Sequence, residues 1–197
     1  MAPINSALPQ RRPALFLDRD GVLIENKSDY VRSVGEAIPL AGAFEALGHL
    51  RRHRPEHLVI VVTNQAGIGK GIITHATVEA IHAHLARWAR AAGGRIDAFY
   101  TCPERNDEPQ RCRKPAPGML LRAAREWSID LSRSVMVGDA VTDVQAGLAA
   151  GVAPLLVRTG RGAHEAGRLA AAGLGAVPVV PDVAAAIERV IALSPDP

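Results

Sequence analysis

Short apolar runs, each long enough for one strand, alternate with longer helical patterns along most of this chain. Turn residues bound every run, and the predicted strands are residues 14–17, 58–62, 98–101, 134–137, 154–157 and 177–180. Strands that alternate with helices are joined by right-handed crossovers, which build a parallel sheet with helices on both faces. We therefore predict a Rossmann-like, three-layer α/β/α fold with a mainly parallel sheet.

The clearest helical pattern begins near Thr74, which can cap the first turn, and ends at Gly93 and Gly94. Along it, apolar residues recur every three or four positions and form one face of a helix. The other predicted helices are residues 42–52, 118–127, 141–150 and 183–193.

The chain of 197 residues fits one domain, and its 48% hydrophobic and 22% charged residues are typical of a folded globular protein. Residues 1–13 contain three prolines and no periodic pattern. We expect a flexible tail there and a single domain over residues 14–197.

The composition excludes several kinds of partner. The longest apolar runs are far shorter than the roughly 20 residues of a membrane-spanning helix, and the N-terminus lacks the apolar stretch of a signal peptide. The net charge is only +3 and aromatic residues make up 4%, which does not favour a nucleic-acid groove. Cys102 and Cys112 are too few for a disulfide framework and are compatible with a reducing compartment. We expect a cytoplasmic monomer without nucleic-acid or membrane partners.

The residues after the predicted strands carry the chemistry of this sequence. In a parallel α/β sheet, ligands bind beyond the carboxyl ends of the strands. The clusters at those ends are Asp18-Arg19-Asp20-Gly21, Thr63-Asn64-Gln65, Gly138-Asp139 with Asp143, and, after a loop that follows the third strand, Arg113-Lys114. An isolated Asp-x-Asp pair is more often a turn or a helix cap, but four clusters at one edge of a sheet favour a functional site.

Asp18 and Asp20 stand two residues apart, and two carboxylates in a dry site need a shared proton or a bound cation. Asp139 at another strand end favours the cation, and oxygen ligands without His or Cys suit Mg²⁺. Beside a phosphoryl group, Thr63 can donate a hydrogen bond and Lys114 can place a positive charge. A carboxylate can then act as the nucleophile and form an aspartyl-phosphate.

In their order and spacing, the four clusters resemble the motifs of the haloacid dehalogenase-like phosphatases, and the resemblance covers about residues 14–195. The Asp-Arg-Asp-Gly form, Gly67 and Gly69, and the run 112–119 are similar to a subgroup that acts on heptose bisphosphates and histidinol phosphate. The resemblance implies a Mg²⁺-dependent phosphatase for a small phosphorylated metabolite, with a sugar bisphosphate as the first candidate. Histidinol phosphate or another phosphomonoester is the alternative substrate, and a phosphate-binding protein without turnover is the alternative class.

Carried onto this chain, the resemblance implies that Asp18 is the nucleophile and that Asp20 protonates the leaving group and later activates water. It implies that the side chains of Asp18 and Asp139 and the backbone carbonyl of Asp20 hold Mg²⁺. In the same scheme, Asp143 organises either the waters of the metal or Lys114.

The resemblance also assigns the grip on the phosphoryl group to Thr63, the backbone of Asn64, and Lys114. Larger relatives carry a cap domain, but residues 21–39 and 102–113 of this chain have room only for loops. We therefore expect no cap domain, and substrate choice then rests on these loops.

Arg113, next to Lys114, either contacts an anionic group of the substrate or faces solvent, and the sequence leaves both open. If it contacts the substrate, the second phosphate of a bisphosphate is its natural partner. Many relatives place Lys or Arg directly after the metal-binding Asp139, whereas this chain has Ala140. One basic contact in that part of the site is therefore missing.

Relatives often carry a zinc loop before the Arg-Lys-Pro run, built as Cys-x-His followed by Cys-x-Cys. This chain keeps Cys102 and Cys112 but has Glu104 and Gln110 at the other two positions. Structural zinc takes four nitrogen or sulfur ligands. Only half of a site remains, so we do not expect zinc.

Two further patterns have simple explanations. Residues 67–71 lack the glycine and hydroxyl positions of nucleotide-binding loops, so we expect a flexible active-site loop. His75, Glu79 and His82 share a helix face, which we expect to be solvated rather than metal-binding.

Overall fold

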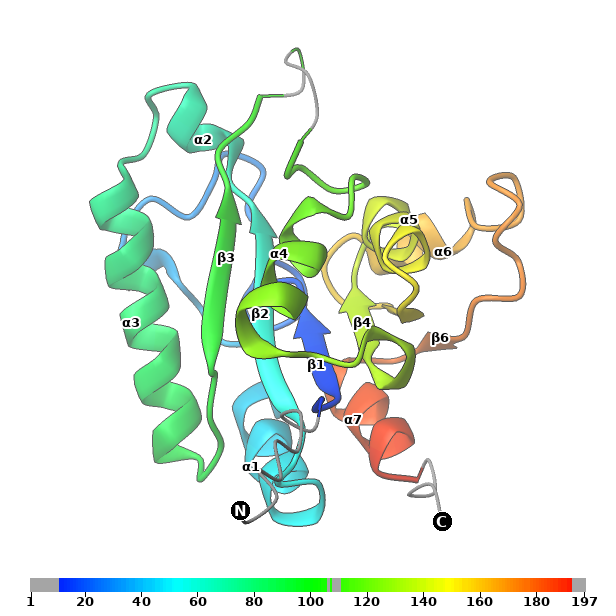
Figure 1. Cartoon of the computed structure of the whole chain (residues 1–197). Coiled ribbons are helices and arrows are strands. Elements are labelled where there is room, and N and C mark those ends of the chain that lie inside the picture. The colour runs from blue at the N-terminus through cyan, green and yellow to red at the C-terminus, as the bar shows by residue number, and fades with distance from the viewer. Residues whose placement is uncertain (1–10, 106, 108–110, 193–197) are drawn as a thin grey trace, which may run out of the picture.

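A computed structural model of the chain describes residues 11–105, 107 and 111–192, so most of the predicted tail, residues 1–10, lies outside the described residues. The described strands form one sheet of six in the order β3-β2-β1-β4-β5-β6, and all neighbouring strands are parallel. The strands are β1 (Ala14–Leu17), β2 (Leu58–Asn64), β3 (Ala98–Cys102), β4 (Val135–Gly138), β5 (Ala153–Val157) and β6 (Val179–Val180). The predicted Rossmann-like α/β fold is confirmed (Figure 1).

Helices cover both faces of the sheet (Figure 1). They are α1 (Ala43–His53), α2 (Ala66–Gly69), α3 (His75–Ala91), α4 (Gly118–Trp127), α5 (Val141–Ala149), α6 (Gly162–Ala166) and α7 (Val183–Ala192), with 3-10 turns at Val34–Glu36 and Leu131–Arg133. One apolar cluster contains α1, α3 and α7, and a second contains α4 and α5. Among the helices of the described residues, none is both long and apolar enough to span a bilayer.

β1 lies inside the sheet and is buried along its whole length. Leu15 and Leu17 belong to the apolar cluster with α1, α3 and α7, whereas Ala14 and Phe16 belong to the cluster with α4 and α5. Alternate side chains of a strand point to opposite faces, so each face of β1 meets its own layer of helices. This explains why the run is apolar at every position rather than at every second one.

The sheet extends on both sides of β1. The chain first adds β2 and β3 on one side, and later adds β4, β5 and β6 on the other. Leu17 at the end of β1 therefore has Val61 of β2 on one side and Val137 of β4 on the other. A parallel sheet opens a crevice at such a switch point, beyond the carboxyl ends of the strands. The residues that follow β1 and β4 thus face one crevice.

Most element boundaries lie within two residues of the predicted ones, but two segments differ. Residues 67–71, expected as a flexible loop, run through α2 into a turn in which the N–H groups of Ile72 and Ile73 bond to the carbonyl of Gly67. Arg12, expected in the tail, already pairs with the chain around Ile129. Its backbone hydrogen bonds with Ser128 and Asp130 fix the entry to β1, so Arg12 does not lie in a flexible tail as predicted.

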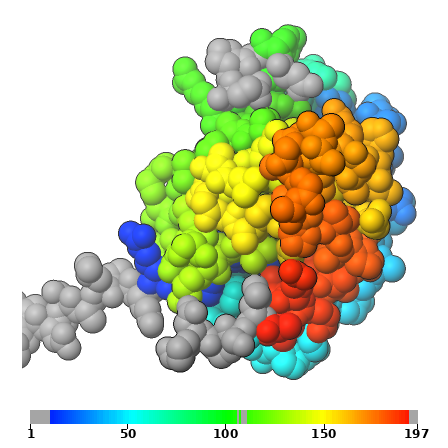
Figure 2. Space-filling view, turned by 90° about the vertical axis from the view of Figure 1, so that its right-hand side faces the viewer, coloured from blue at the N-terminus to red at the C-terminus, as the bar shows by residue number. Residues whose placement is uncertain are grey.

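The segment between β5 and β6 covers the β6 edge of the sheet. Leu169 packs with Val144 of α5 and Leu156 of β5 in a third apolar cluster. Figure 2 shows this segment (orange) beside α5 (yellow) and next to α7 (red). The sequence did not predict α6, because five residues are too few for a periodic pattern. Arg161 stands immediately before α6, where the segment leaves the crevice.

His82 is buried, although its helix face was expected to be solvated. The ring stacks on Phe99 of β3 at a centroid distance of 4.3 Å, and neither ring nitrogen has a hydrogen-bond partner among the described residues. Burial, together with the charge of Arg19, lowers the pKa of His82 to about 3, so the ring is neutral. His75 and Glu79 are exposed as expected. The prediction for His82 was wrong because β3 lies against this part of α3 only in the folded sheet.

The neutral His82 predicts a loss of stability in mild acid. In the unfolded chain the ring titrates near its ordinary pKa of 6.5, whereas the folded protein keeps it neutral down to about 3. Below pH 6.5 the unfolded state therefore binds the extra proton, which weakens folding by about 1.4 kcal/mol for each further pH unit. Between pH 6.5 and 4.5, we expect wild-type protein to lose about 2 kcal/mol more unfolding free energy than His82→Phe, measured by urea denaturation. Equal losses would show that the folded protein protonates this ring.

Candidate active site

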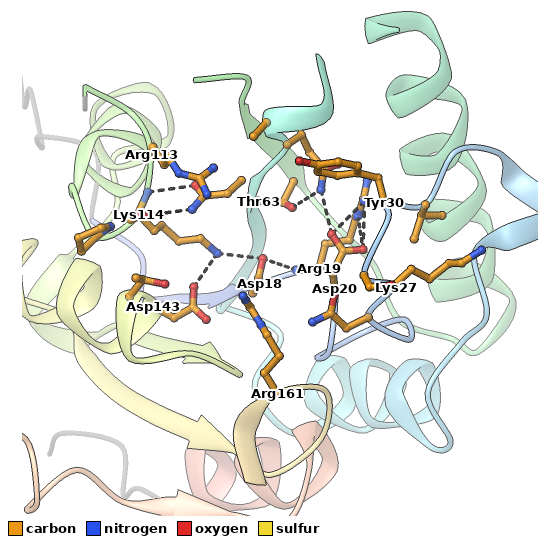
Figure 3. Close-up of a pocket in the computed structure, with 18 of the residues that line it drawn as sticks. Asp18, Arg19, Asp20, Lys27, Tyr30, Thr63, Arg113, Lys114, Asp143 and Arg161 are labelled. Carbon is orange, nitrogen blue, oxygen red and sulfur yellow. Dashed lines mark hydrogen bonds and ion pairs between the residues drawn. The ribbon is translucent and has the colours of Figure 1, made fainter. Parts of the chain in front are cut away.

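A cavity of about 500 Å³ opens at the carboxyl ends of β1, β2 and β4. Its walls include Asp18, Thr63, Arg113, Lys114 and Asp143, which come from four separate segments of the chain (Figure 3). The strand-end residues singled out in the sequence therefore lie together in one place.

Lys114 is the centre of a buried ion-pair network. Its Nζ lies 2.9 Å from Asp18 Oδ1 and 2.7 Å from Asp143 Oδ1, and it donates to the carbonyl oxygen of Val62 at 2.9 Å. Burial alone would lower the pKa of Lys114, but Asp143 and Asp18 outweigh burial and the pKa is raised. Lys114 is thus a fixed positive charge that ties the end of β1 to the first turn of α5.

Asp139, directly after β4, is buried against two glycines. A side chain at Gly21 or Gly160 would collide with the Asp139 carboxylate, and both glycines have a positive φ, of 86° and 57°. On another side, the backbone N–H of Arg161 donates to Asp139 Oδ2 at 2.9 Å, and Arg161 Nη2 lies 3.2 Å from Oδ1. Burial and the neighbouring Asp18 raise the pKa of Asp139.

Asp18, Asp139 and Asp143 each bring a carboxylate oxygen to within 4.8 Å of the other two. All three residues are buried, and such carboxylates repel one another unless a cation lies between them. Burial raises the pKa of Asp143, Lys114 acts in the opposite direction, and the two other carboxylates add to the rise. This all-oxygen donor set fits Mg²⁺, a hard cation that accepts carboxylates and keeps several waters.

Asp20 turns toward a buried arginine rather than toward these carboxylates. Arg19 Nη2 lies 3.0 Å from Asp20 Oδ2, and Arg19 Nε lies 3.3 Å from Oδ1, which is a two-pronged pair. Gln65 Nε2 donates to Asp20 Oδ2 at 2.9 Å and to Thr63 Oγ1 at 2.8 Å. These contacts fix the Asp20 carboxylate on the cavity wall. The metal contact predicted for Asp20 uses its backbone carbonyl and stays a prediction.

Thr63 and Asn64 at the end of β2 have different tasks. Thr63 Oγ1 accepts from Gln65, which leaves the hydroxyl hydrogen of Thr63 for another acceptor. The side chain of Asn64 pairs with the backbone of Lys114: Nδ2 donates to the carbonyl oxygen at 3.1 Å and Oδ1 accepts the N–H at 3.0 Å. The sequence suggested only a backbone role for Asn64. Its side chain also holds Lys114 in place.

One carboxylate holds the loop before Lys114. Glu104 Oε2 accepts hydrogen bonds from the backbone N–H groups of Arg111, Cys112 and Arg113 at 2.8, 3.1 and 3.2 Å. Burial opposes the effect, but these bonds lower the pKa of Glu104 and keep it charged. The guanidinium of Arg113 also donates to the carbonyl oxygen of Glu104 at 3.4 Å. Glu104 thereby fixes the backbone of Arg113, whose side chain lines the cavity.

Cys102 and Cys112 are joined by a disulfide, whereas the sequence analysis treated them as thiols in a reducing compartment. The pair forms because the end of β3 lies beside the residue that precedes Arg113. Both sulfurs and a Glu104 oxygen lie close enough to share a metal. However, the sulfurs are bonded to each other and Glu104 is occupied by three N–H groups, so the described residues of this loop do not fit zinc.

We expect the purified protein to contain no stoichiometric zinc, because Glu104 rather than a metal organises this loop. Elemental analysis of protein purified without added metal tests this. Glu104→Gln keeps the size of the acceptor but removes its charge, and should lower the unfolding free energy by about 1 kcal/mol. Asp107→Asn, which removes an exposed carboxylate of the same loop, is the matched control and should change stability less. One zinc per chain would contradict this account.

Arg19, Gln65 and Arg161 are among the polar side chains of the cavity to which sequence reasoning gave no role. Arg19 and Gln65 stand inside the recognised motifs, but the contact of Gln65 with Asp20 depends on how β1 and β2 are paired. Arg161 had a usable signal, because it stands shortly after the end of β5, a strand end like the others.

The chain matches known proteins along most of its length. Residues 111–186 match the model of the HAD-hydrolase-like family. The D-glycero-beta-D-manno-heptose-1,7-bisphosphate 7-phosphatase of Bordetella bronchiseptica is 40% identical over 148 residues, which cover 75% of this chain and 82% of that protein. The protein of the same name from Pseudomonas aeruginosa is 38% identical over 157 residues, which cover 80% of this chain and 87% of that protein.

A solved structure shares the fold as well. The crystal structure of D,D-heptose 1,7-bisphosphate phosphatase from B. bronchiseptica, complexed with magnesium and phosphate, matches with a TM-score of 0.84 at 37% identity. The match covers 92% of this chain and 99% of that chain. The family resemblance seen in the four motifs is therefore confirmed. The chain belongs to the haloacid dehalogenase-like phosphatases, in the group that contains the heptose-1,7-bisphosphate 7-phosphatases.

Proposed function

We propose that this protein is a Mg²⁺-dependent phosphatase that removes the 7-phosphate of a heptose 1,7-bisphosphate through an aspartyl-phosphate on Asp18. The observation that carries the proposal is the buried Asp18 carboxylate, which Lys114 holds beside Asp139 and Asp143. The relatives of that name support the substrate, and the relative complexed with magnesium and phosphate supports the metal.

The contacts of Asp18 suggest which oxygen attacks. Oδ1 accepts the backbone N–H of Arg19 at 2.7 Å and faces Lys114, so we assign the attack to Oδ2. In the first step, Asp18 Oδ2 forms a bond to phosphorus while the bond between phosphorus and the sugar oxygen breaks. Asp20 donates a proton to that oxygen, and the sugar leaves as an alcohol.

The second step returns Asp18 to its starting state. Asp20, now a carboxylate, takes a proton from a water molecule whose oxygen attacks phosphorus. The bond between Asp18 Oδ2 and phosphorus breaks, which releases inorganic phosphate. Arg19 and Gln65 hold Asp20 on the same wall of the cavity through both steps.

Lys114 and Thr63 stabilise the negative charge of the transferred phosphoryl group. In phosphoryl transfer this charge is spread over three equatorial oxygens. The ammonium of Lys114 is fixed beside Asp18, and the hydroxyl of Thr63 has its hydrogen left to donate. The carboxylates of Asp18 and Asp139 would hold Mg²⁺, which would supply further positive charge next to the transferred group.

Substrate choice rests on loops in this proposal, which describes an enzyme without a cap domain. The described residues between β1 and α1 form turns and one 3-10 turn, and those between β3 and α4 form turns. Arg113 on the cavity wall offers a guanidinium to the phosphate at the far end of the sugar. We place the enzyme in the cytoplasm and expect it to act as a monomer.

Wild-type protein should hydrolyse heptose 1,7-bisphosphate with a higher kcat/KM than heptose 7-phosphate or histidinol phosphate. EDTA should stop the reaction, and Mg²⁺ should restore it. Arg113→Gln should lower kcat/KM for the bisphosphate by about tenfold to a hundredfold and lower the other two less, because a charge-assisted contact worth roughly 1.5–3 kcal/mol is lost. Arg111→Gln is the matched control, since Arg111 is exposed in the same loop.

Two outcomes would change the assignment. If histidinol phosphate is the best substrate, or if Arg113→Gln lowers all three values equally, the bisphosphate assignment fails while the aspartyl-phosphate chemistry stands. Binding of these compounds without phosphate release would instead indicate a phosphate-binding protein.

A further inference from the structure

Arg161 is a cation that faces all three buried carboxylates of the site. Its backbone N–H donates to Asp139 Oδ2 at 2.9 Å, and its Nη2 lies 3.2 Å from Oδ1, so both oxygens of Asp139 are engaged. Figure 3 shows the Arg161 side chain extending toward Asp18. Burial would lower the pKa of Arg161, but Asp139, Asp18 and Asp143 together raise it. Arg161 therefore engages the same Asp139 carboxylate that the proposed Mg²⁺ would use.

With Arg161 in that position, the negative charge of the three carboxylates is not fully balanced. Three carboxylates face two single positive charges, those of Lys114 and Arg161. A divalent cation together with Lys114 balances the three carboxylates, and a guanidinium beside that cation is then repelled. Arg161 and Mg²⁺ are thus competitors for the oxygens of Asp139.

The side chain of Arg161 is exposed enough to move away from Asp139. Its side chain is 58% exposed, whereas that of Asp139 is fully buried. Its backbone stays bound to Asp139 through the N–H, which keeps the guanidinium within reach of the cavity. Arg113 lines the same cavity, and its pKa is lowered chiefly by burial and in part by the charge of Arg161. The two guanidiniums therefore act on one region of the cavity.

The other cations of the described cavity wall are engaged elsewhere. Lys27 Nζ lies 3.0 Å from Glu36 Oε2, and Lys70 Nζ lies 5.8 Å from the ring centre of Tyr30. A metal at Asp139 would free neither of them. Position 140, directly after Asp139, carries only an alanine and supplies no charge.

We propose that Mg²⁺ displaces the guanidinium of Arg161 from Asp139, and that the displaced guanidinium joins Arg113 in binding the second phosphate of the substrate. This inference rests on the proposed function, because it needs a substrate with two phosphates. Arg161 is then a specificity-determining residue. Metal and bisphosphate favour each other's binding, since the metal releases the guanidinium and the second phosphate keeps it from returning.

Isothermal titration of substrate-free protein with Mg²⁺ tests the displacement without any turnover. Arg161→Gln removes the competitor, and its Kd for Mg²⁺ should be tighter than that of wild type, on the order of fivefold. Arg168→Gln is the matched control: it removes one positive charge and one carboxylate pair from the same segment, away from the cavity. Its Kd for Mg²⁺ should equal that of wild type. An Arg161→Gln protein that binds Mg²⁺ no more tightly than Arg168→Gln would overturn the displacement.

The second measurement compares kcat/KM for heptose 1,7-bisphosphate and heptose 7-phosphate. Arg161→Gln should lower the ratio of the two values about tenfold, whereas Arg161→Lys, which keeps the charge, should restore most of it. Equal losses on both substrates would overturn the contact with the second phosphate. A wild-type protein without any bisphosphate preference would overturn the proposed function and this contact, while tighter Mg²⁺ binding by Arg161→Gln would still support the displacement.

Discussion

Asp18→Asn should release no measurable phosphate from heptose 1,7-bisphosphate, a loss of at least about 10⁴-fold in kcat. The amide oxygen is a poor nucleophile, and the covalent intermediate cannot form. The fold should survive, because Lys114 keeps its 2.7 Å ion pair with Asp143 and one of three mutually repelling buried carboxylates becomes neutral. In metal-free buffer the melting temperature of Asp18→Asn should therefore equal or exceed that of wild type.

Phosphate release and thermal unfolding, measured on the same preparations, separate the two effects. Asp130→Asn is a suitable control, because Asp130 caps the 3-10 turn before β4. This turn lies at the amino-terminal ends of the strands, whereas the site lies at their carboxyl ends. It should lose some stability and keep its activity. An Asp18→Asn protein that turns over at near wild-type rates would exclude Asp18 as the nucleophile.

Asp20→Asn should show a loss that depends on the leaving group. With a sugar phosphate, which needs a proton on the departing oxygen, kcat should fall by about 10²- to 10⁴-fold. With p-nitrophenyl phosphate, whose leaving group needs no proton, the first step should survive while the second step stays slow. Rapid mixing should then show a burst of p-nitrophenol, roughly one per active site, followed by slow turnover.

The burst distinguishes a catalytic acid and base from a residue that merely supports the fold. Gln65→Ala removes one of the donors that hold Asp20 but leaves its carboxylate, so it should slow both substrates moderately and give no burst. If Asp20→Asn slows both substrates equally and without a burst, Asp20 does not act in acid–base chemistry.

The fold was largely predictable because its signals are local. The run at β1 is apolar at every position, which is the pattern of a strand covered on both faces. The Thr74 cap and the apolar stripe that follows it mark α3 within one turn. The positions of Asp18, Asp139 and Lys114 at strand ends could then be deduced from the topology of parallel sheets.

Several of the contacts that the sequence did not reveal join distant segments. Arg161 meets Asp139 across 22 positions, and the side chain of Asn64 meets the backbone of Lys114 across 50. His82 lies on a helix face that looks polar until β3 is placed against it. The role of Glu104 depends on a backbone curve that brings three N–H groups to one oxygen, and no spacing rule encodes such a curve.

Glu104 holds residues 111–113 through a charge that belongs to the polypeptide and not to a bound ion. A loop that needs a bound zinc loses its shape, and with it the grip on the substrate, whenever that ion is scarce. Here the counter-charge is part of the polypeptide and is made with every copy of the protein. If the protein holds no zinc, as we expect, the shape of this part of the loop does not change with the supply of a trace metal.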